Sequence, residues 1–68
     1  MKAPQSAVNH IIKSFNGEEE FGGGDGWLVT FRSQEDTESV IKLVEMLNGW
    51  EATEHLNILH MVQIQGVS

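Results

Sequence analysis

Residues 33–48 carry start, periodicity and stop signals for one amphipathic helix, and they constrain the fold more than any other segment. Ser33 is of the residue type that caps helix N-termini, Asp36 follows three residues later, and Asn48-Gly49 is a stop signal. One face of this helix would carry Val40, Leu43, Val44 and Leu47. The opposite face would carry Glu35, Glu38, Lys42 and Glu45. The segment therefore predicts an amphipathic helix.

Two segments that flank this helix are typical of strands. Trp27–Arg32 is rich in β-branched and aromatic residues. Leu56–Ile64 is a long apolar run in which Ile58, Val62 and Ile64 share one face with His60. A strand, a helix and a strand in succession form a βαβ unit, whose crossover is right-handed if the strands are parallel. Trp50 to His55 is expected to be a linker.

The spacing of Ala7, Val8, Ile11, Ile12 and Phe15 predicts a further helix, which begins at Pro4 and ends at Asn16-Gly17. Residues 16–26 hold five of the seven glycines and are expected to form a flexible Gly/Glu-rich loop. The alternative makes Asn16-Gly17 a hairpin turn between a strand at Val8–Phe15 and a short acidic strand. With a helix and then a loop in this part of the chain, the order of elements is αβαβ. With the hairpin, the order is ββαβ.

The fold class predicted for residues 1–68 is α+β: a single domain with a small single-layer sheet and one or two helices packed on it. A chain of 68 residues holds a small core, and the absence of cysteine excludes a disulfide. Two strands leave exposed edges, which favour pairing with a partner strand or a second copy. A homodimer is therefore one expectation.

The charge balance is strongly acidic. Ten acidic residues against four basic ones give a formal net charge of −6. Such a charge opposes attraction to nucleic-acid phosphates and to anionic lipid, so neither a nucleic acid nor a membrane is the expected partner. The sequence has no long apolar run and no cysteine, and a cytoplasmic location is expected. Acidity by itself serves solubility as well as recognition of a basic partner.

The sequence offers no convincing catalytic or metal-binding pattern. His10, His55 and His60 are scattered, and Gly22–Gly26 is followed by a strand instead of the helix that a phosphate-binding loop requires. We therefore expect no enzyme activity, no cofactor and no metal. A small enzyme or an allosteric ligand site would need a convergent set of polar residues.

Binding to another protein is the leading functional hypothesis. The expected partner has a basic surface, and the expected contacts are the acidic residues and the two tryptophans, which are preferred interface anchors. The candidate residues are Glu18, Glu19, Glu20, Trp27, Glu35, Asp36, Glu38 and Trp50. By analogy, such a chain suits a small inhibitor of the kind encoded by phages or mobile elements, which binds a host protein or occupies a nucleic-acid-binding surface.

From Gly26 to Gln65 the order GWLVTFRSQEDTESVIKLVEMLNGWE, followed by LNILHMVQIQ, resembles the second half of an RNA-recognition motif. The resemblance implies a half ferredoxin-like shape. The stacking aromatics and basic residue of that family's RNA-binding strand are not matched, because Asp25 and Trp27-Leu28 stand in their place. The alternative function is a single-stranded nucleic-acid binder, in which oligonucleotides would quench the fluorescence of Trp27.

Overall fold

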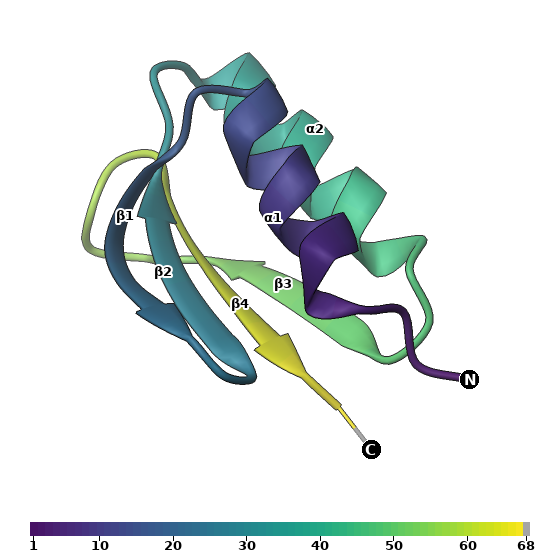
Figure 1. Ribbon diagram of the computed structural model, residues 1–68. Coiled ribbons are helices and arrows are strands. Elements are labelled where there is room, and N and C mark those ends of the chain that lie inside the picture. Colours follow the sequence, from purple (N-terminus) through teal and green to yellow (C-terminus); the bar gives the residue numbers. More distant parts are fainter. Residues whose placement is uncertain (68) are drawn as a thin grey trace.

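The computed structural model describes residues 1–67 and contains two α-helices and one four-stranded antiparallel sheet. Both helices lie side by side on the same face of the sheet (Figure 1). In chain order the elements are α1 (Gln5–Ser14), β1 (Glu18–Gly23), β2 (Gly26–Thr30), α2 (Gln34–Glu45), β3 (Trp50–Glu54) and β4 (Met61–Gly66). The predicted α+β class with a small sheet is confirmed.

The strand order in the sheet is β1-β2-β4-β3, and each neighbouring pair is antiparallel. Two hairpins, β1–β2 and β3–β4, therefore meet along a central contact between β2 and β4. Each hairpin follows a helix, so the succession helix, strand, strand occurs twice. The predicted order αβαβ lacks β1 and β3. The expected βαβ unit is not formed, because β3 reverses the chain before β4 and leaves β4 antiparallel to β2.

The segment 16–26 is not the flexible loop that its composition predicts. Glu18–Gly23 forms β1, which pairs with β2, and the chain turns at Gly24 and Asp25. Gly24 has φ of +58°, a left-handed conformation that glycine adopts at little cost. The alternative order foresaw an acidic strand, but it placed a strand at Val8–Phe15, where the chain forms α1. Glutamate and glycine have low strand propensity, and the hydrogen bonds with β2 hold this segment in the strand conformation.

The C-terminal hairpin also differs from the prediction. Trp50–Glu54, expected to be a linker, is strand β3, and β4 begins only at Met61. The chain between them forms a loop over residues 55–60, which we call the 55–60 loop. The predicted strand Leu56–Ile64 is therefore too long at its start, and Ile58 is 45% exposed instead of sharing the buried face of Val62 and Ile64.

The start of α2 agrees with the prediction. Ser33 is the N-cap, and its side-chain oxygen accepts a hydrogen bond from the backbone N–H of Asp36 at 3.1 Å. Thr37 is buried, and its hydroxyl donates to the Ser33 carbonyl oxygen at 2.9 Å. Along the apolar face, Val40 and Val44 are fully buried, whereas Leu43 is 38% exposed.

The hydrophobic core lies between the helices and the sheet. The helices contribute Val8, Ile12, Val40 and Val44. The sheet and the residue after β2 contribute Trp27, Val29, Phe31, Trp50, Ala52, Val62 and Ile64. Because side chains alternate along a strand, every second residue of the sheet points away from this core. Neither helix covers that opposite face of the sheet. We call it the open face (Figure 1).

Candidate functional site

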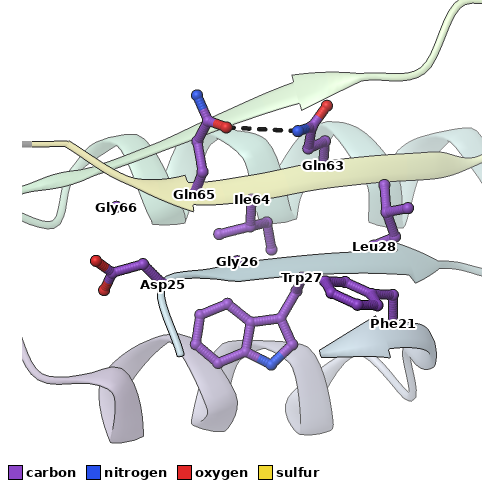
Figure 2. Close-up of a pocket in the computed structure, with 9 residues that line it drawn as sticks. All are labelled: Phe21, Asp25, Gly26, Trp27, Leu28, Gln63, Ile64, Gln65 and Gly66. Atoms are coloured by element: carbon purple, nitrogen blue, oxygen red, sulfur yellow. Dashed lines mark hydrogen bonds between the residues drawn. The ribbon is translucent and has the colours of Figure 1, made fainter. Parts of the chain in front are cut away.

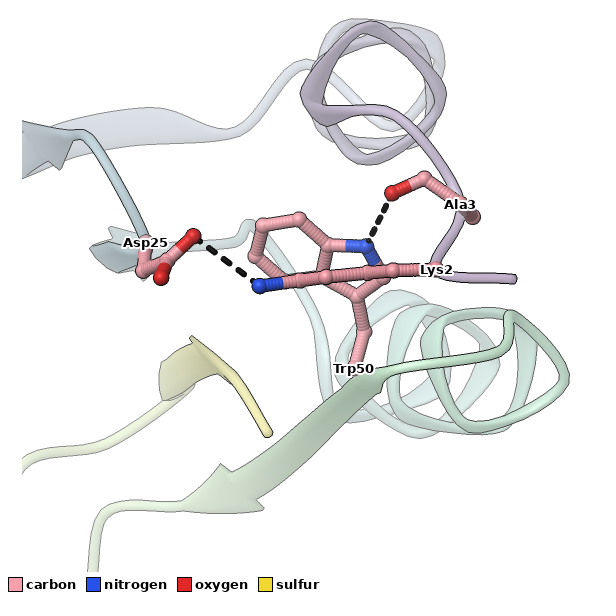
Figure 3. A network of polar contacts seen from close by, with 4 residues as sticks. All are labelled: Lys2, Ala3, Asp25 and Trp50. Atoms are coloured by element: carbon pink, nitrogen blue, oxygen red, sulfur yellow. Dashed lines mark hydrogen bonds and ion pairs between the residues drawn. The ribbon is translucent and has the colours of Figure 1, made fainter. Parts of the chain in front are cut away.

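The two tryptophans that the sequence suggested as binding residues are part of the core. Trp27 is 6% exposed and Trp50 is 4% exposed. The indole N–H of Trp50 donates to the carbonyl oxygen of Ala3 at 2.7 Å, and the ammonium group of Lys2 lies 4.7 Å from the centre of its ring (Figure 3). Neither tryptophan has the exposure that an interface anchor needs, and the N-terminal residues cover Trp50.

The glutamates Glu18, Glu19 and Glu20 are exposed on β1, which is an edge strand. Glu18 is opposite Thr30 and Glu19 is opposite Val29, so these two residues lie on opposite faces of the sheet. The register shifts between Glu19 and Phe21, which makes a bulge at Glu20. Charges and bulges both hinder pairing at a free edge. The three carboxylates therefore surround the edge of the sheet and do not gather on one face.

The acidic residues of α2 lie near a carboxylate that the sequence hypothesis did not include. Glu35 and Asp36 are in the first turn of the helix. The side-chain amide of Gln34 donates to Glu38 at 3.2 Å and to both carboxylate oxygens of Glu54 at 3.3 Å. Glu54 is the last residue of β3, so it lies directly before the 55–60 loop. The structure thus joins the predicted acidic helix face to this loop.

Few of these carboxylates are neutralised by cations within the chain. Lys2 and Asp25 form an ion pair at 3.1 Å, and residues 1–67 contain no second one. The carboxylates of Glu38 and Glu54 accept hydrogen bonds from the side-chain amide of Gln34, which carries no charge. The negative charge at this end of the molecule is therefore available to an external cation.

The 55–60 loop exposes three large aliphatic side chains. Leu56 is 96% exposed, Leu59 is 74% exposed and Ile58 is 45% exposed. At the base of the loop the His55 N–H donates to the Met61 carbonyl oxygen at 2.8 Å. The Phe31 N–H, directly after β2, donates to the His60 carbonyl oxygen at 2.9 Å and joins the loop to that strand. His60 has φ of +62°, which is uncommon for a residue with a side chain. Sequence reasoning missed this surface, because an apolar run favours a buried strand.

A groove lies on the open face near the β1–β2 turn, with a volume of about 360 Å³ (Figure 2). We call it the open-face groove and define it by Phe21, Asp25, Leu28, Gln63 and Gln65. Gln63 donates a hydrogen bond to Gln65 at 3.4 Å, and Gln65 in turn donates to Glu51. Neither Phe21 nor the two glutamines had a signal in the sequence that pointed to a site.

No protein-family model matches this chain, and neither a curated protein nor a solved structure is significantly similar to it. The surfaces described above therefore carry the functional argument. Within residues 1–67, no three histidine, aspartate or glutamate side chains are grouped so that they could hold a metal ion. In the same part of the chain, neither helix has the length and apolar character needed to cross a bilayer.

Proposed function

We propose that this chain is a small acidic interaction module that acts by binding, and that its partner is a protein with a basic surface. The observation that carries the proposal is the position of Leu56 and Leu59, 96% and 74% exposed, directly after the carboxylate of Glu54. Exposed apolar side chains with a polar rim are typical of interface centres. The 55–60 loop would be the centre of the interface, and the acidic residues of α2 would form its rim.

The energetics favour a pocket on the partner that accepts one or both leucines. Burying one leucine side chain contributes about 1.5–3 kcal/mol. The carboxylates Glu35, Asp36, Glu38 and Glu54 would add less affinity than this, but they would speed association with a basic surface and orient the partner. Glu18, Glu19 and Glu20 extend the same negative potential along the sheet edge.

We extend the proposal to inhibition. A protein surface that is basic and has apolar or aromatic pockets is the kind of surface that binds single-stranded nucleic acid. A chain with net charge −6 would compete with a polyanion for that surface. Such an inhibitor would have to be in the same compartment as its nucleic-acid-binding target, and the sequence favours the cytoplasm as that compartment. Competition, not catalysis, is then the activity.

The experiment is a capture from lysate of the source cells, followed by measured binding of the captured protein. Leu56→Ser and Leu59→Ser should each weaken binding about tenfold or more, because loss of a central anchor costs above about 1.4 kcal/mol. Met46→Ser is the matched control, since Met46 is 79% exposed but lies at the end of α2. Equal binding by all three variants would reject the loop as the interface centre.

The charges are tested in the same assay. Glu38→Lys and the triple change of Glu18, Glu19 and Glu20 to Lys should weaken binding, and the loss should shrink as salt rises. Glu45→Lys changes the same charge at the other end of α2 and is the control. Addition of single-stranded nucleic acid should release the chain from its partner. A partner that binds the chain and nucleic acid together would contradict the inhibitory part of the proposal.

Single-stranded nucleic-acid binding is the second candidate, and the open face favours it. The RNA-recognition motif, whose second half the sequence resembles, stacks bases on aromatic side chains of its sheet. Phe21, 65% exposed, is such an aromatic side chain and is paired with Leu28 on the open face. Trp27 points to the core, so quenching of its fluorescence is not the right measurement. Oligonucleotides at low salt should instead shift the NMR signals of the Phe21 ring, and unchanged signals would exclude this function.

A further inference from the structure

The open-face groove combines an apolar floor with hydrogen-bond acceptors. Phe21 and Leu28 are paired across β1 and β2, and they provide the apolar contacts. Asp25 lies at one end, and its side chain is 69% exposed. Gln65 lies across the groove and is hydrogen-bonded to the carboxylate of Glu51. The charged residue that lines the groove is therefore a carboxylate, Asp25, and no lysine, arginine or histidine is among the lining residues.

The glutamine hydrogen bonds run in one direction and leave an acceptor free. Gln63 donates to Gln65, and Gln65 donates to Glu51. In this chain of bonds each amide nitrogen donates once, whereas the side-chain oxygen of Gln63 accepts no hydrogen bond from residues 1–67. A ligand with several N–H donors would complete the arrangement, because a donor-rich group finds acceptors at Gln63 and at Asp25.

The fold already places one cation beside this groove. The ammonium group of Lys2 bonds to one oxygen of Asp25 at 3.1 Å and lies over the ring of Trp50 (Figure 3). This contact leaves the second carboxylate oxygen of Asp25 without a partner from residues 1–67. A cation that stacks on an aromatic ring while it bonds to Asp25 is thus compatible with the local geometry. Phe21 adds a second aromatic ring to the lining of the same groove.

We propose that the open-face groove binds the guanidinium group of an arginine side chain that the partner protein presents. A guanidinium is planar, carries five N–H donors and stacks on aromatic rings, so it fits Phe21, Asp25 and Gln63 better than an ammonium does. The groove volume of about 360 Å³ is at the small end for ligand sites, which suits one side chain. The protein origin of the arginine rests on the proposed function.

The test is an NMR titration of the intact chain with N-acetyl-arginine amide. Backbone signals of Phe21 and Leu28 and the side-chain amide signals of Gln63 and Gln65 should shift and saturate. The expected Kd is in the millimolar range, which corresponds to a binding free energy of about −4 kcal/mol. N-acetyl-lysine amide should bind at least threefold more weakly. Equal affinity for the two compounds, or shifts that do not saturate, would overturn the proposal.

Variants locate the site. Phe21→Leu keeps the apolar floor and removes the stacking ring, and Asp25→Asn keeps the shape and removes the charge; each should weaken arginine binding threefold or more. Glu45→Gln removes a charge from α2 and should leave the Kd unchanged. The same spectra report whether each variant is folded. Unchanged arginine affinity in both Phe21→Leu and Asp25→Asn would reject the groove.

This outcome is separable from that of the proposed function. Leu56→Ser and Leu59→Ser should each weaken binding to the captured partner about tenfold or more but leave the arginine titration unchanged. Saturable arginine binding without any captured partner would contradict only the proposed function. A captured partner together with no arginine binding in the groove would contradict only this inference.

A pentapeptide with a single arginine should bind at least as tightly as the free arginine amide if a protein side chain is the ligand.

Discussion

The indole rings of Trp27 and Trp50 contact each other inside the core, with their centroids 5.5 Å apart and their planes tilted by 50°. Trp27 belongs to β2 and Trp50 to β3, and β4 lies between these strands in the sheet. The pair therefore connects the two hairpins on the helix side of the sheet. Lys2 and Ala3 bind the outer side of Trp50, which attaches the N-terminal residues to the same cluster.

Trp50→Phe should lower the free energy of unfolding by about 1–3 kcal/mol. The variant loses the hydrogen bond to the Ala3 carbonyl and leaves part of the indole volume unfilled. Lys2→Ala should cost about 1 kcal/mol or less, because its ion pair and ring contact are partly exposed to solvent. Urea unfolding followed by far-UV circular dichroism measures both values. A larger loss for Lys2→Ala than for Trp50→Phe would contradict this account of the cluster.

Gly17→Ala should destabilise the fold by about 1–3 kcal/mol through overpacking. A Cβ atom at Gly17 would lie 2.6 Å from a methyl carbon of Val29 and 2.7 Å from the ring of Phe31. Gly26→Ala is the control, since a Cβ there meets only the Ile64 carbonyl oxygen, at 3.7 Å. Thermal unfolding should show a lower Tm for Gly17→Ala alone. Equal Tm values for the two variants would mean that α1 can move away from the sheet at no cost.

Replacement of Glu18, Glu19 and Glu20 by threonine should increase self-association. Threonine favours strands, and the change removes three like charges that repel a second copy at the free edge of β1. Light scattering at increasing protein concentration measures the dimer fraction relative to the parent chain. The control changes Glu35, Glu38 and Glu45 to Gln, which removes the same charge from α2. If the control associates equally, net charge and not the strand edge limits association.

Ser33→Ala should lower the free energy of unfolding by about 1 kcal/mol, because the variant loses the cap on the Asp36 N–H. Ser6→Ala in α1 is the comparison, since Ser6 is exposed, makes no hydrogen bond through its side chain within residues 1–67, and alanine favours helices. Chemical unfolding should separate the two variants. A neutral Ser33→Ala would show that the acidic first turn of α2 holds the helix start without the serine.

Signals that lie within a few residues of each other were sufficient to predict the helices. Ser33 and Asn48-Gly49 delimit α2 in the sequence, and the same reasoning located α1 between Pro4 and Asn16. Strand β1 was missed because its glutamates and glycines have low strand propensity, and it exists through pairing with β2. Short strand β3 was missed for the same reason, since its hydrogen bonds come from β4.

The candidate site was predicted only in part. Composition identified the acidic residues, but the grouping of Glu38 with Glu54 depends on Gln34, which bonds to both across different elements. Periodicity cannot separate an apolar loop from a buried strand, so Leu56 and Leu59 were assigned to the sheet. The tryptophans were assigned to the surface because the sequence does not reveal that Ala3 and Lys2 cover Trp50.

Strand β4 is the last of the described elements along the chain, yet it occupies a central place in the sheet between β2 and β3. Its inward side chains, Val62 and Ile64, are fully buried against residues that come much earlier in the sequence. During synthesis, α1, the first hairpin and α2 must therefore wait with their apolar surfaces uncovered until residues 61–66 leave the ribosome. We therefore expect the chain to complete its fold only after β4 is available, and a nascent chain stopped before Met61 to expose apolar surface that chaperones and proteases recognise.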